Sequence, residues 1–275
     1  PKILCKAPSR FLGRRMNGFY AAIAMSATLV PPEFFRDVLG FDKNATRLVS
    51  FPSPFPQENR KVLVAPRFST TYRLRRRSYE QAARTIEHIV SLKKGNYFVF
   101  FSSFDYLRAV SQYLSPPGFV LLRQERSMSE RERAELLRKL AERDESHLIL
   151  AVQGGIFAEG VDYPGEMLIG AIIVGPGLPK YNFEQELMRE HFQERYGAGF
   201  EYAYLYPGMN RVVQSAGRVI RTEDDRGIIA LLGARFARPE YHSLFPHDWY
   251  VYSPKELIAT DYAEEIRQFW AESEP

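Results

Sequence analysis

The sequence predicts an α/β fold, built as an open and mainly parallel sheet with helices on both faces. Short runs rich in β-branched and aromatic residues alternate with stretches of helical periodicity, the pattern typical of this class. Most of the short runs are continuously apolar, as expected for strands that are covered on both faces. The chain has 275 residues, of which 45% are hydrophobic and 25% charged, so it can bury a substantial core.

Seven apolar runs are predicted to be the strands of this sheet. Each is short, and the stretches between several of them are long enough for a crossover helix. In chain order the runs are Ala21–Ser26, Val62–Ala65, Tyr97–Phe101, Phe119–Leu122, His147–Val152, Ala171–Val174 and Gly227–Leu232.

Four stretches have the periodicity or the start signals of helices. Ser78–Leu92 places its apolar residues on one face. Ser129 begins a second helix, because Glu132 follows three residues later in a capping-box pattern. A third helix is expected from about Asn182 to Tyr196, and a fourth in the tail Asp261–Pro275, whose aromatic face we expect to pack on the domain.

We interpret residues 1–275 as one domain with a helical embellishment. A separate helical subdomain at residues 180–210 is the alternative. Two irregular segments rich in proline, Pro52–Pro56 and Gly175–Lys180, are expected to be loops. The chain begins with Pro1 rather than Met, so we expect it to be a fragment of a larger protein.

Composition excludes several classes of protein. The single cysteine, Cys5, excludes an internal disulfide and a multi-cysteine metal site, and the five histidines lack metal-ligand spacing, so no metal site is predicted. No run reaches the roughly 20 apolar residues that span a bilayer. No secretory signal is recognisable, and a cytoplasmic location is expected.

The charge pattern is compatible with nucleic-acid binding. The net charge is only +4, but the pI is about 9.1 and arginine is preferred over lysine. Arginine binds phosphate bidentately, whereas lysine acts as a point charge. Arginines cluster at Arg73–Arg77, Arg123–Arg133 and Arg211–Arg226, although a solvated surface explains the middle cluster equally well.

The most specific feature is the segment Gln214-Ser-Ala-Gly-Arg218-Val-Ile-Arg221 before the last strand. On one helix, Gln214, Arg218 and Arg221 at spacings of four and seven would share a face, and Gly217 would allow close approach to it. Guanidinium groups beside a buried strand need anionic or polar partners, and a phosphate chain is the natural recipient. Pairing with the carboxylates of Glu223–Asp225 is the alternative.

A second feature is the glycine-rich, acidic loop after the strand His147–Val152. Open α/β sheets bind ligands at the carboxyl ends of their strands. Paired glycines allow close backbone approach, and carboxylates can accept hydrogen bonds from ribose hydroxyls, water or arginine. The residues concerned are Gly154, Gly155, Glu159, Gly160 and Asp162.

These two segments resemble helicase motifs V and VI of the XPD/DinG family of superfamily 2 iron–sulfur DNA helicases. The resemblance extends over nearly the whole chain. Ser26-Ala-Thr-Leu29 is similar to motif III, Ser53–Arg60 to the linking segment, Asn96–Leu107 to motif IV, and Gly227–Phe236 to the strand and turn after motif VI. It implies a RecA-like fold and the second, C-terminal motor domain.

Two features depart from the family pattern. Ser102 stands where the family usually has proline. The phosphate-binding loop, the magnesium box and the four cysteines of the 4Fe–4S cluster are missing from the sequence. By the resemblance, ATP is held with Mg by a first motor domain, which also carries the iron–sulfur cluster.

The resemblance implies roles for individual residues. Arg218 and Arg221 would be arginine fingers, and Gln214 would position the nucleotide or the attacking water. Among the nucleotide contacts (Glu159, Gly160, Asp162 and Gly217), Asp162 would lie near the ribose. Ser26 and Thr28 would couple closure of the two motor domains to movement along the strand.

Single-stranded DNA is the expected partner, with 5′ to 3′ translocation expected from the resemblance. Candidate contacts are hydroxyls, an aromatic ring and polar groups near the strand ends. They are Ser102, Ser103, Tyr106, Gln124, Arg126, Gly154 and Gly155. Core packing is the alternative for Tyr106.

Two other functions are alternatives. A nucleotide-dependent oxidoreductase or transferase could use Gly175-Pro-Gly177, but a third glycine at the right spacing and an acid on a following strand are missing. A non-catalytic module that binds single-stranded nucleic acid is the stronger alternative. We expect the isolated chain to be inactive as an ATPase and, in a bacterium, the full protein to be associated with the nucleoid.

Overall fold

A computed structural model describes residues 3–158, 163 and 165–272. Its contacts divide the chain into two compact units. Unit 1 comprises Pro1–Pro52 and Leu178–Asn210, and unit 2 comprises Ser53–Gly177 and Arg211–Pro275. The helical stretch expected near residues 180–210 therefore lies in the same unit as the N-terminal segment.

Unit 2 is built on a six-stranded sheet in which every pair of neighbours is parallel, in the order β1-β6-β5-β2-β4-β3. This confirms the predicted α/β fold. The strands are β1 (Arg60–Ala65), β2 (Tyr97–Phe101), β3 (Val120–Arg123), β4 (His147–Val152), β5 (Gly170–Val174) and β6 (Gly227–Leu232). Four of them, β2, β4, β5 and β6, are buried throughout, which explains their continuous apolar sequence.

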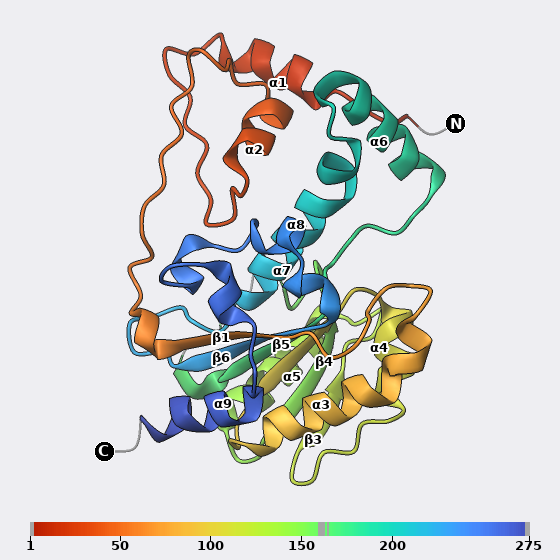
Figure 1. Ribbon diagram of the computed structural model, residues 1–275, viewed down its shortest axis with the longest axis vertical. Helices are drawn as coiled ribbons and strands as arrows, with labels where there is room; N and C mark the ends of the chain where they lie inside the picture. The colour runs from red at the N-terminus through yellow and green to blue at the C-terminus, as the bar shows by residue number, and fades with distance from the viewer. Residues whose placement is uncertain (1–2, 159–162, 164, 273–275) are drawn as a thin grey trace. The chain divides into compact units, whose positions relative to one another are not determined.

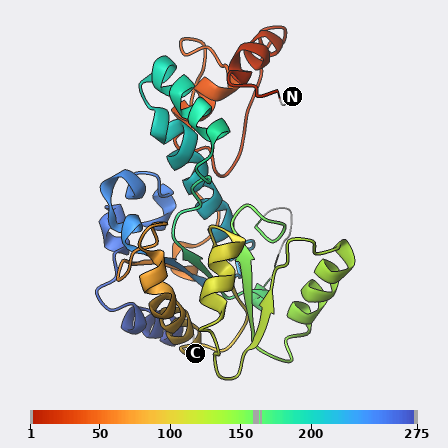
Figure 2. The same cartoon turned by 90° about the vertical axis from the view of Figure 1, so that its right-hand side faces the viewer.

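Helices cover both faces of this sheet (Figures 1 and 2). The helices α3 (Tyr79–Ser91), α4 (Phe104–Ser111) and α9 (Tyr262–Ala271) lie on one face, and α5 (Glu130–Glu142) lies on the other. Ser129 caps α5 with the predicted capping box, in which its hydroxyl and the Glu132 carboxylate satisfy each other's backbone N–H groups. Local capping chemistry was therefore predicted correctly.

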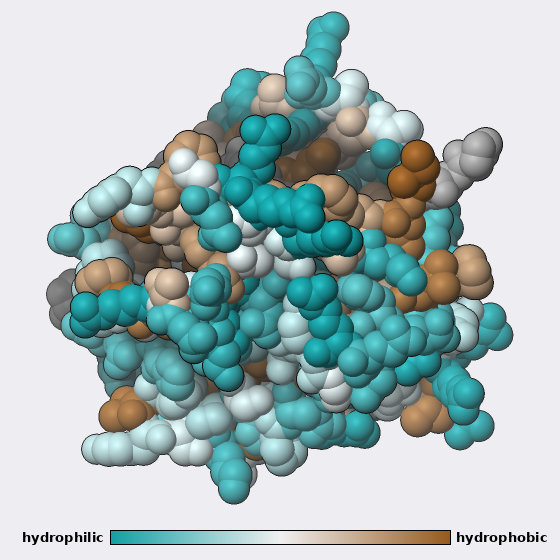
Figure 3. Space-filling view, turned by 90° about the horizontal axis from the view of Figure 1, so that it is seen from above, coloured by the Kyte–Doolittle hydropathy of each residue, from teal (hydrophilic) through white to brown (hydrophobic). Residues whose placement is uncertain are grey.

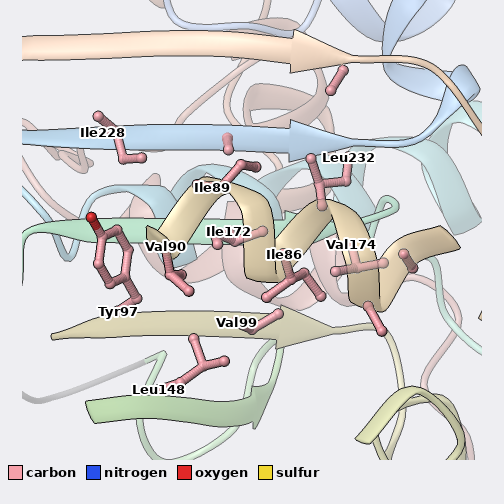
Figure 4. Packing of buried hydrophobic residues seen from close by; sticks show 14 of the residues in the cluster. Ile86, Ile89, Val90, Tyr97, Val99, Leu148, Ile172, Val174, Ile228 and Leu232 are labelled. Atoms are coloured by element: carbon pink, nitrogen blue, oxygen red, sulfur yellow. The ribbon is translucent and has the colours of Figure 1, made fainter. Parts of the chain in front are cut away.

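The main core lies between α3 and the sheet. Ile86, Ile89 and Val90 point from α3 toward Ile172 and Val174 of β5 and their neighbours (Figure 4). The tail also joins this core, since α9 buries a row of apolar residues against it. They are Tyr262, Ile266, Phe269 and Trp270, so the predicted packing of the tail is confirmed.

Unit 1 is helical. It contains α1 (Pro8–Met16), α2 (Pro32–Leu39), α6 (Phe183–Tyr196) and a π-helical turn at Glu201–Leu205 that continues into α7 (Tyr206–Ala216), which enters unit 2. Its core is a cluster of aromatic rings from α2, α6 and the π-helical turn. Two tyrosine hydroxyls there donate to carboxylates, Tyr202 to Asp37 at 2.7 Å and Tyr204 to Glu186 at 2.6 Å.

The predicted strand Ala21–Ser26 is wrong. The segment has no regular secondary structure and no strand pairing, and Ile23 and Met25 are 87% and 85% exposed. A strand needs a neighbour to satisfy its backbone groups, and within the described residues of unit 1 no sheet offers one.

The remaining elements are short. They are the helix α8 (Pro239–His242) and the 3₁₀ turns Gln57–Asn59, Arg75–Ser78, Gly165–Met167, Ala234–Ala237, His247–Trp249 and Pro254–Leu257. Figure 3 shows hydrophobic residues scattered in small groups over a largely hydrophilic face. None of the helices in the described part of the chain is long and apolar enough to cross a membrane.

Candidate functional site

Motif IV and the glycine-rich loop meet at the carboxyl ends of two neighbouring strands. Ser102 and Ser103 follow β2, and Gln153 to Gly155 follow β4, which pairs with β2. The backbone N–H of Gln153 donates to the carbonyl of Phe101 at 2.9 Å, which extends the ladder one residue beyond β4. Motif IV and the glycine-rich loop therefore lie side by side, at the sheet edge where open α/β folds bind ligands.

The two serines of motif IV differ in their bonding. Ser103 is the N-cap of α4, and its hydroxyl accepts from the backbone N–H of Tyr106 at 3.2 Å. Ser102 is half-buried, and its hydroxyl makes no hydrogen bond to the described residues. Ser102 thus has the hydroxyl with free hydrogen-bonding capacity at this edge.

Tyr106 does not have the predicted exposure for base stacking. Its side chain is fully buried in the main core, against Tyr79 and Phe101 at ring distances of 5.6 and 5.5 Å. Burial also raises the pKa of the Tyr106 hydroxyl above its ordinary value. The alternative interpretation, core packing, is the one that the structure favours.

Gln124 is likewise buried, whereas Arg126 is exposed. The Gln124 side-chain oxygen accepts from the backbone N–H of Val152 at 3.0 Å, so it completes the pairing beyond β3. Arg126 lies over the ring of Phe104 at 4.8 Å, with its guanidinium 3.8 Å from the Asp105 carboxylate. Of these two predicted contacts, only Arg126 is accessible to a strand at the surface.

The paired glycines are required by close packing. Gly154 has a φ of +68°, and a Cβ there would lie 3.3 Å from Nε of Arg211. A Cβ on Gly155 would lie 2.9 Å from the Gln124 amide nitrogen. Arg211 was missed by the sequence analysis as part of this site, and its guanidinium donates to the Gly177 carbonyl at 3.1 Å.

An arginine-rich segment stands beside motif IV. Arg75 lies over two rings, Tyr72 at 4.8 Å and Tyr106 at 5.0 Å. Tyr72 is 80% exposed, and Arg73, Arg76 and Arg77 are exposed as well. The sequence from residue 59 to residue 79 contains no acidic residue, so this run is not a surface of interspersed opposite charges.

The arginines of motif VI do not share a helical face. Gln214 lies in α7, but α7 ends at Ala216, and Arg218 and Arg221 lie in the loop that leads to β6. The helix ends here because Gly217 is a poor helix former. It ends in a tight turn, in which the N–H of Arg218 donates to the carbonyl of Ser215 at 3.4 Å. The predicted spacing of four and seven along one helix is therefore wrong.

Asp225 organises this loop. Its carboxylate is 1% exposed and accepts three backbone N–H groups, from Arg221 at 2.6 Å, from Thr222 at 2.7 Å and from Gly165 at 2.8 Å. From the sequence, this acid is expected only as an ion-pair partner of arginine. The signal available is its place two residues before β6, where the loop must turn.

Several predicted site residues are placed apart from these. Glu159, Gly160 and Asp162 lie outside the described residues. Ser26 and Thr28 lie in unit 1, where the Ser26 hydroxyl is 3.2 Å from both the hydroxyl and the backbone N–H of Thr28. Gly217 is exposed between α7 and Arg218.

A cavity of about 480 Å³ opens at the opposite, amino edge of the sheet. Lys93, Asn96, Arg143, Glu166 and Trp270 are among the residues that line it. Its charges are of both signs, and it does not include the serines of motif IV or the paired glycines. Within residues 3–158, 163 and 165–272, no group of three or more acidic, histidine or cysteine side chains could hold a metal ion.

Comparisons with known proteins agree with this architecture. Residues 86–251 match the family model of the helicase C-terminal domain. A probable ATP-dependent helicase of Methanocaldococcus jannaschii is 29% identical over 236 residues, which cover 82% of this chain and 36% of that protein. The ATP-dependent DNA helicase DinG of Photobacterium profundum is 28% identical over 227 residues, which cover 80% of this chain and 32% of that protein.

Solved structures show the same fold. An XPD helicase aligns with a TM-score of 0.67 and 20% identity over 87% of this chain and 43% of its own. The chain spans about a third of the length of the two relatives above, 36% and 32%. The family model alone covers more than half of the chain, and the relatives are of one type. The chain therefore belongs to the helicase C-terminal domain family, in its XPD/DinG group.

Proposed function

We propose that this chain is the second motor domain of an ATP-dependent DNA helicase. In this proposal ATP and Mg are held mainly by a first motor domain of the same polypeptide, which also carries a 4Fe–4S cluster. The observation that carries the proposal is the loop after α7, where Arg221 is exposed while its backbone N–H is fixed by the buried Asp225. A guanidinium on a fixed backbone can neutralise charge that develops on a phosphoryl group.

The exposed apolar segment of unit 1 supports the presence of a partner domain. Phe19, Tyr20, Ile23 and Met25 are between 68% and 108% exposed, and the segment has the composition of a strand. Exposed apolar runs of this kind mark surfaces that another protein element covers. We assign that element to the first motor domain, with Ser26 and Thr28 at the junction.

Single-stranded DNA is the proposed nucleic-acid partner. Its track would run along the carboxyl edge of the sheet, past the Ser102 hydroxyl, Arg126 and the arginine-rich segment Arg73–Arg77. The arginines and hydroxyls would bind the phosphates of the strand. The helicase would translocate along it in the 5′ to 3′ direction. The same proposal places the protein with the nucleoid if its source is bacterial.

The proposed division of labour is tested by single-turnover ATP hydrolysis with single-stranded DNA. The chain alone should not hydrolyse ATP, and adding a first motor domain should restore DNA-stimulated hydrolysis. Hydrolysis by the chain alone would refute the division.

The arginine assignment is tested in the full-length protein. Arg221→Ala should lower the rate of ATP hydrolysis by about 10³-fold or more, the contribution of an arginine finger, while DNA affinity stays unchanged. Arg84→Ala, which removes an exposed arginine of α3, is the matched control and should hydrolyse ATP normally. Normal turnover by Arg221→Ala with intact DNA binding would favour the alternative, a non-catalytic module that binds single-stranded nucleic acid.

A further inference from the structure

Two segments that the sequence separates by more than fifty residues are joined by one carboxylate. The Oδ2 atom of Asp225 accepts from the N–H groups of Arg221 and Thr222, and the Oδ1 atom accepts from the N–H of Gly165. Gly165 closes the glycine-rich loop of motif V, and Arg221 ends motif VI. Both oxygens are therefore used, each toward a different motif.

The bonds are strong because the acceptor is charged and out of water. Asp225 is 1% exposed, and the three donor–acceptor distances are 2.6, 2.7 and 2.8 Å. Charge-assisted hydrogen bonds of this length are roughly twice as strong as neutral ones. A buried carboxylate that lost these donors would be costly, so the loop is held in this one conformation.

The neighbouring residue reinforces the anchor. The Arg226 guanidinium donates to the carbonyls of Glu58 at 3.1 Å and Phe269 at 2.6 Å and lies 4.1 Å from the Phe269 ring centre. The base of the loop is thus attached to the strand entry and to α9, and only its outer part, with Arg221, is exposed.

We propose that Asp225 is a positioning residue that sets the place of Arg221 relative to the end of the motif V loop. The inference deepens the proposed function and rests on it for its kinetic consequence. Asp225 touches no substrate in this scheme. It fixes the backbone from which the Arg221 side chain extends, and it makes that position depend on Gly165.

Asp225→Asn is the informative substitution. The asparagine keeps the shape of the side chain but replaces one acceptor oxygen by an NH₂ group, which cannot accept from either set of N–H groups. Either Gly165 or the pair Arg221 and Thr222 then loses its partner. Asp224→Asn is the matched control, because Asp224 is the adjacent carboxylate and is exposed.

The kinetic test uses DNA-stimulated ATP hydrolysis by the full-length protein. Asp225→Asn should lower kcat about 10²-fold, the effect of a displacement near 1 Å at a reacting group. KM for ATP should change by less than about threefold, because the lost interaction acts in the transition state. Single-strand affinity should stay unchanged, and Asp224→Asn should match the wild type.

Two results would overturn the proposal. One is a kcat for Asp225→Asn equal to that of the wild type. The other is a parallel loss of kcat, ATP affinity, DNA affinity and thermal stability, since that pattern marks general damage to the fold.

A second measurement needs no variant. In the wild-type protein, the peptide that covers Arg221 and Thr222 should exchange its amide hydrogens slowly although their side chains are exposed. Exchange as fast as in the exposed segment at residues 47–51 would overturn the anchor itself. If the wild-type protein lacked DNA-stimulated hydrolysis, the proposed function would fail, while slow exchange would still establish the anchor.

Discussion

Asn96 offers a direct test of how the sheet edge is held together. It precedes β2, is 2% exposed and uses both ends of its amide. The NH₂ group donates to the carbonyls of Leu140 at 3.1 Å and Met167 at 3.2 Å, and the oxygen accepts from the backbone N–H of His147 at 3.0 Å and from its ring at 3.1 Å. The end of α5, the segment before β5 and the start of β4 therefore meet on one side chain.

Asn96→Ala removes all of these bonds at once. Each buried hydrogen bond contributes about 1 kcal/mol net, and a buried donor left without a partner costs about 1–3 kcal/mol. The bonds to the Leu140 carbonyl and the His147 N–H are buried, so water does not replace the lost side chain at every partner. We expect the free energy of unfolding to fall by about 3 kcal/mol.

The assay is urea unfolding of the chain, followed by fluorescence. The midpoint should fall while the slope of the free energy with urea stays the same, which assigns the change to stability rather than to the unfolded state. Asn59→Ala is the matched control, since Asn59 is only half-buried and makes one hydrogen bond, 2.8 Å to the Glu223 carbonyl. It should lose less than about 1 kcal/mol. A loss below about 1 kcal/mol for Asn96→Ala would refute the reasoning.

Two further substitutions separate alternatives. Asp261 caps α9, and the bonds from the N–H groups of Glu264 and Ala263 hold the pKa of its carboxyl below the ordinary value. A lowered pKa gives stability that is present above the unfolded pKa of about 3.9 and is lost as pH falls through the folded pKa. The melting temperatures of the wild type and Asp261→Asn should therefore converge in acid. A difference in melting temperature that is independent of pH would contradict this. Tyr106→Phe should leave single-strand affinity unchanged in an anisotropy titration, because the ring is buried, whereas a tenfold loss would restore Tyr106 as a DNA contact.

Predictions that depend on local sequence succeeded. The strands β2, β4 and β6 begin and end at the predicted residues, because a run buried on both faces is apolar at every position. Ser129 caps its helix as expected, since a cap involves groups within three residues. The helix expected from about Asn182 to Tyr196 is also present, as α6.

Predictions that depend on distant partners failed. Ala21–Ser26 has the composition of a strand, but pairing requires a neighbour that composition does not supply. Tyr106 and Gln124 were assigned to DNA because they stand near strand ends, and only the packing of α4 and the pairing beyond β3 reveal that both are buried. The predicted helix through Arg221 is too long, because Gly217 ends α7 at Ala216 and the Asp225 carboxylate accepts the backbone N–H of Arg221.

Burial separates two arginines that sequence alone would group together. Arg221 and Arg226 both follow α7 in the same arginine cluster, but Arg226 donates to two backbone carbonyls and lies over an aromatic ring, which commits it to the fold. The backbone N–H of Arg221 donates to Asp225, and its side chain is exposed at the surface. An arginine that serves a nucleotide held by another domain must combine a fixed backbone with an accessible guanidinium, because mobility would cost rate and burial would prevent contact. By that criterion, the proposed arginine-finger role is assigned to Arg221 rather than to Arg226.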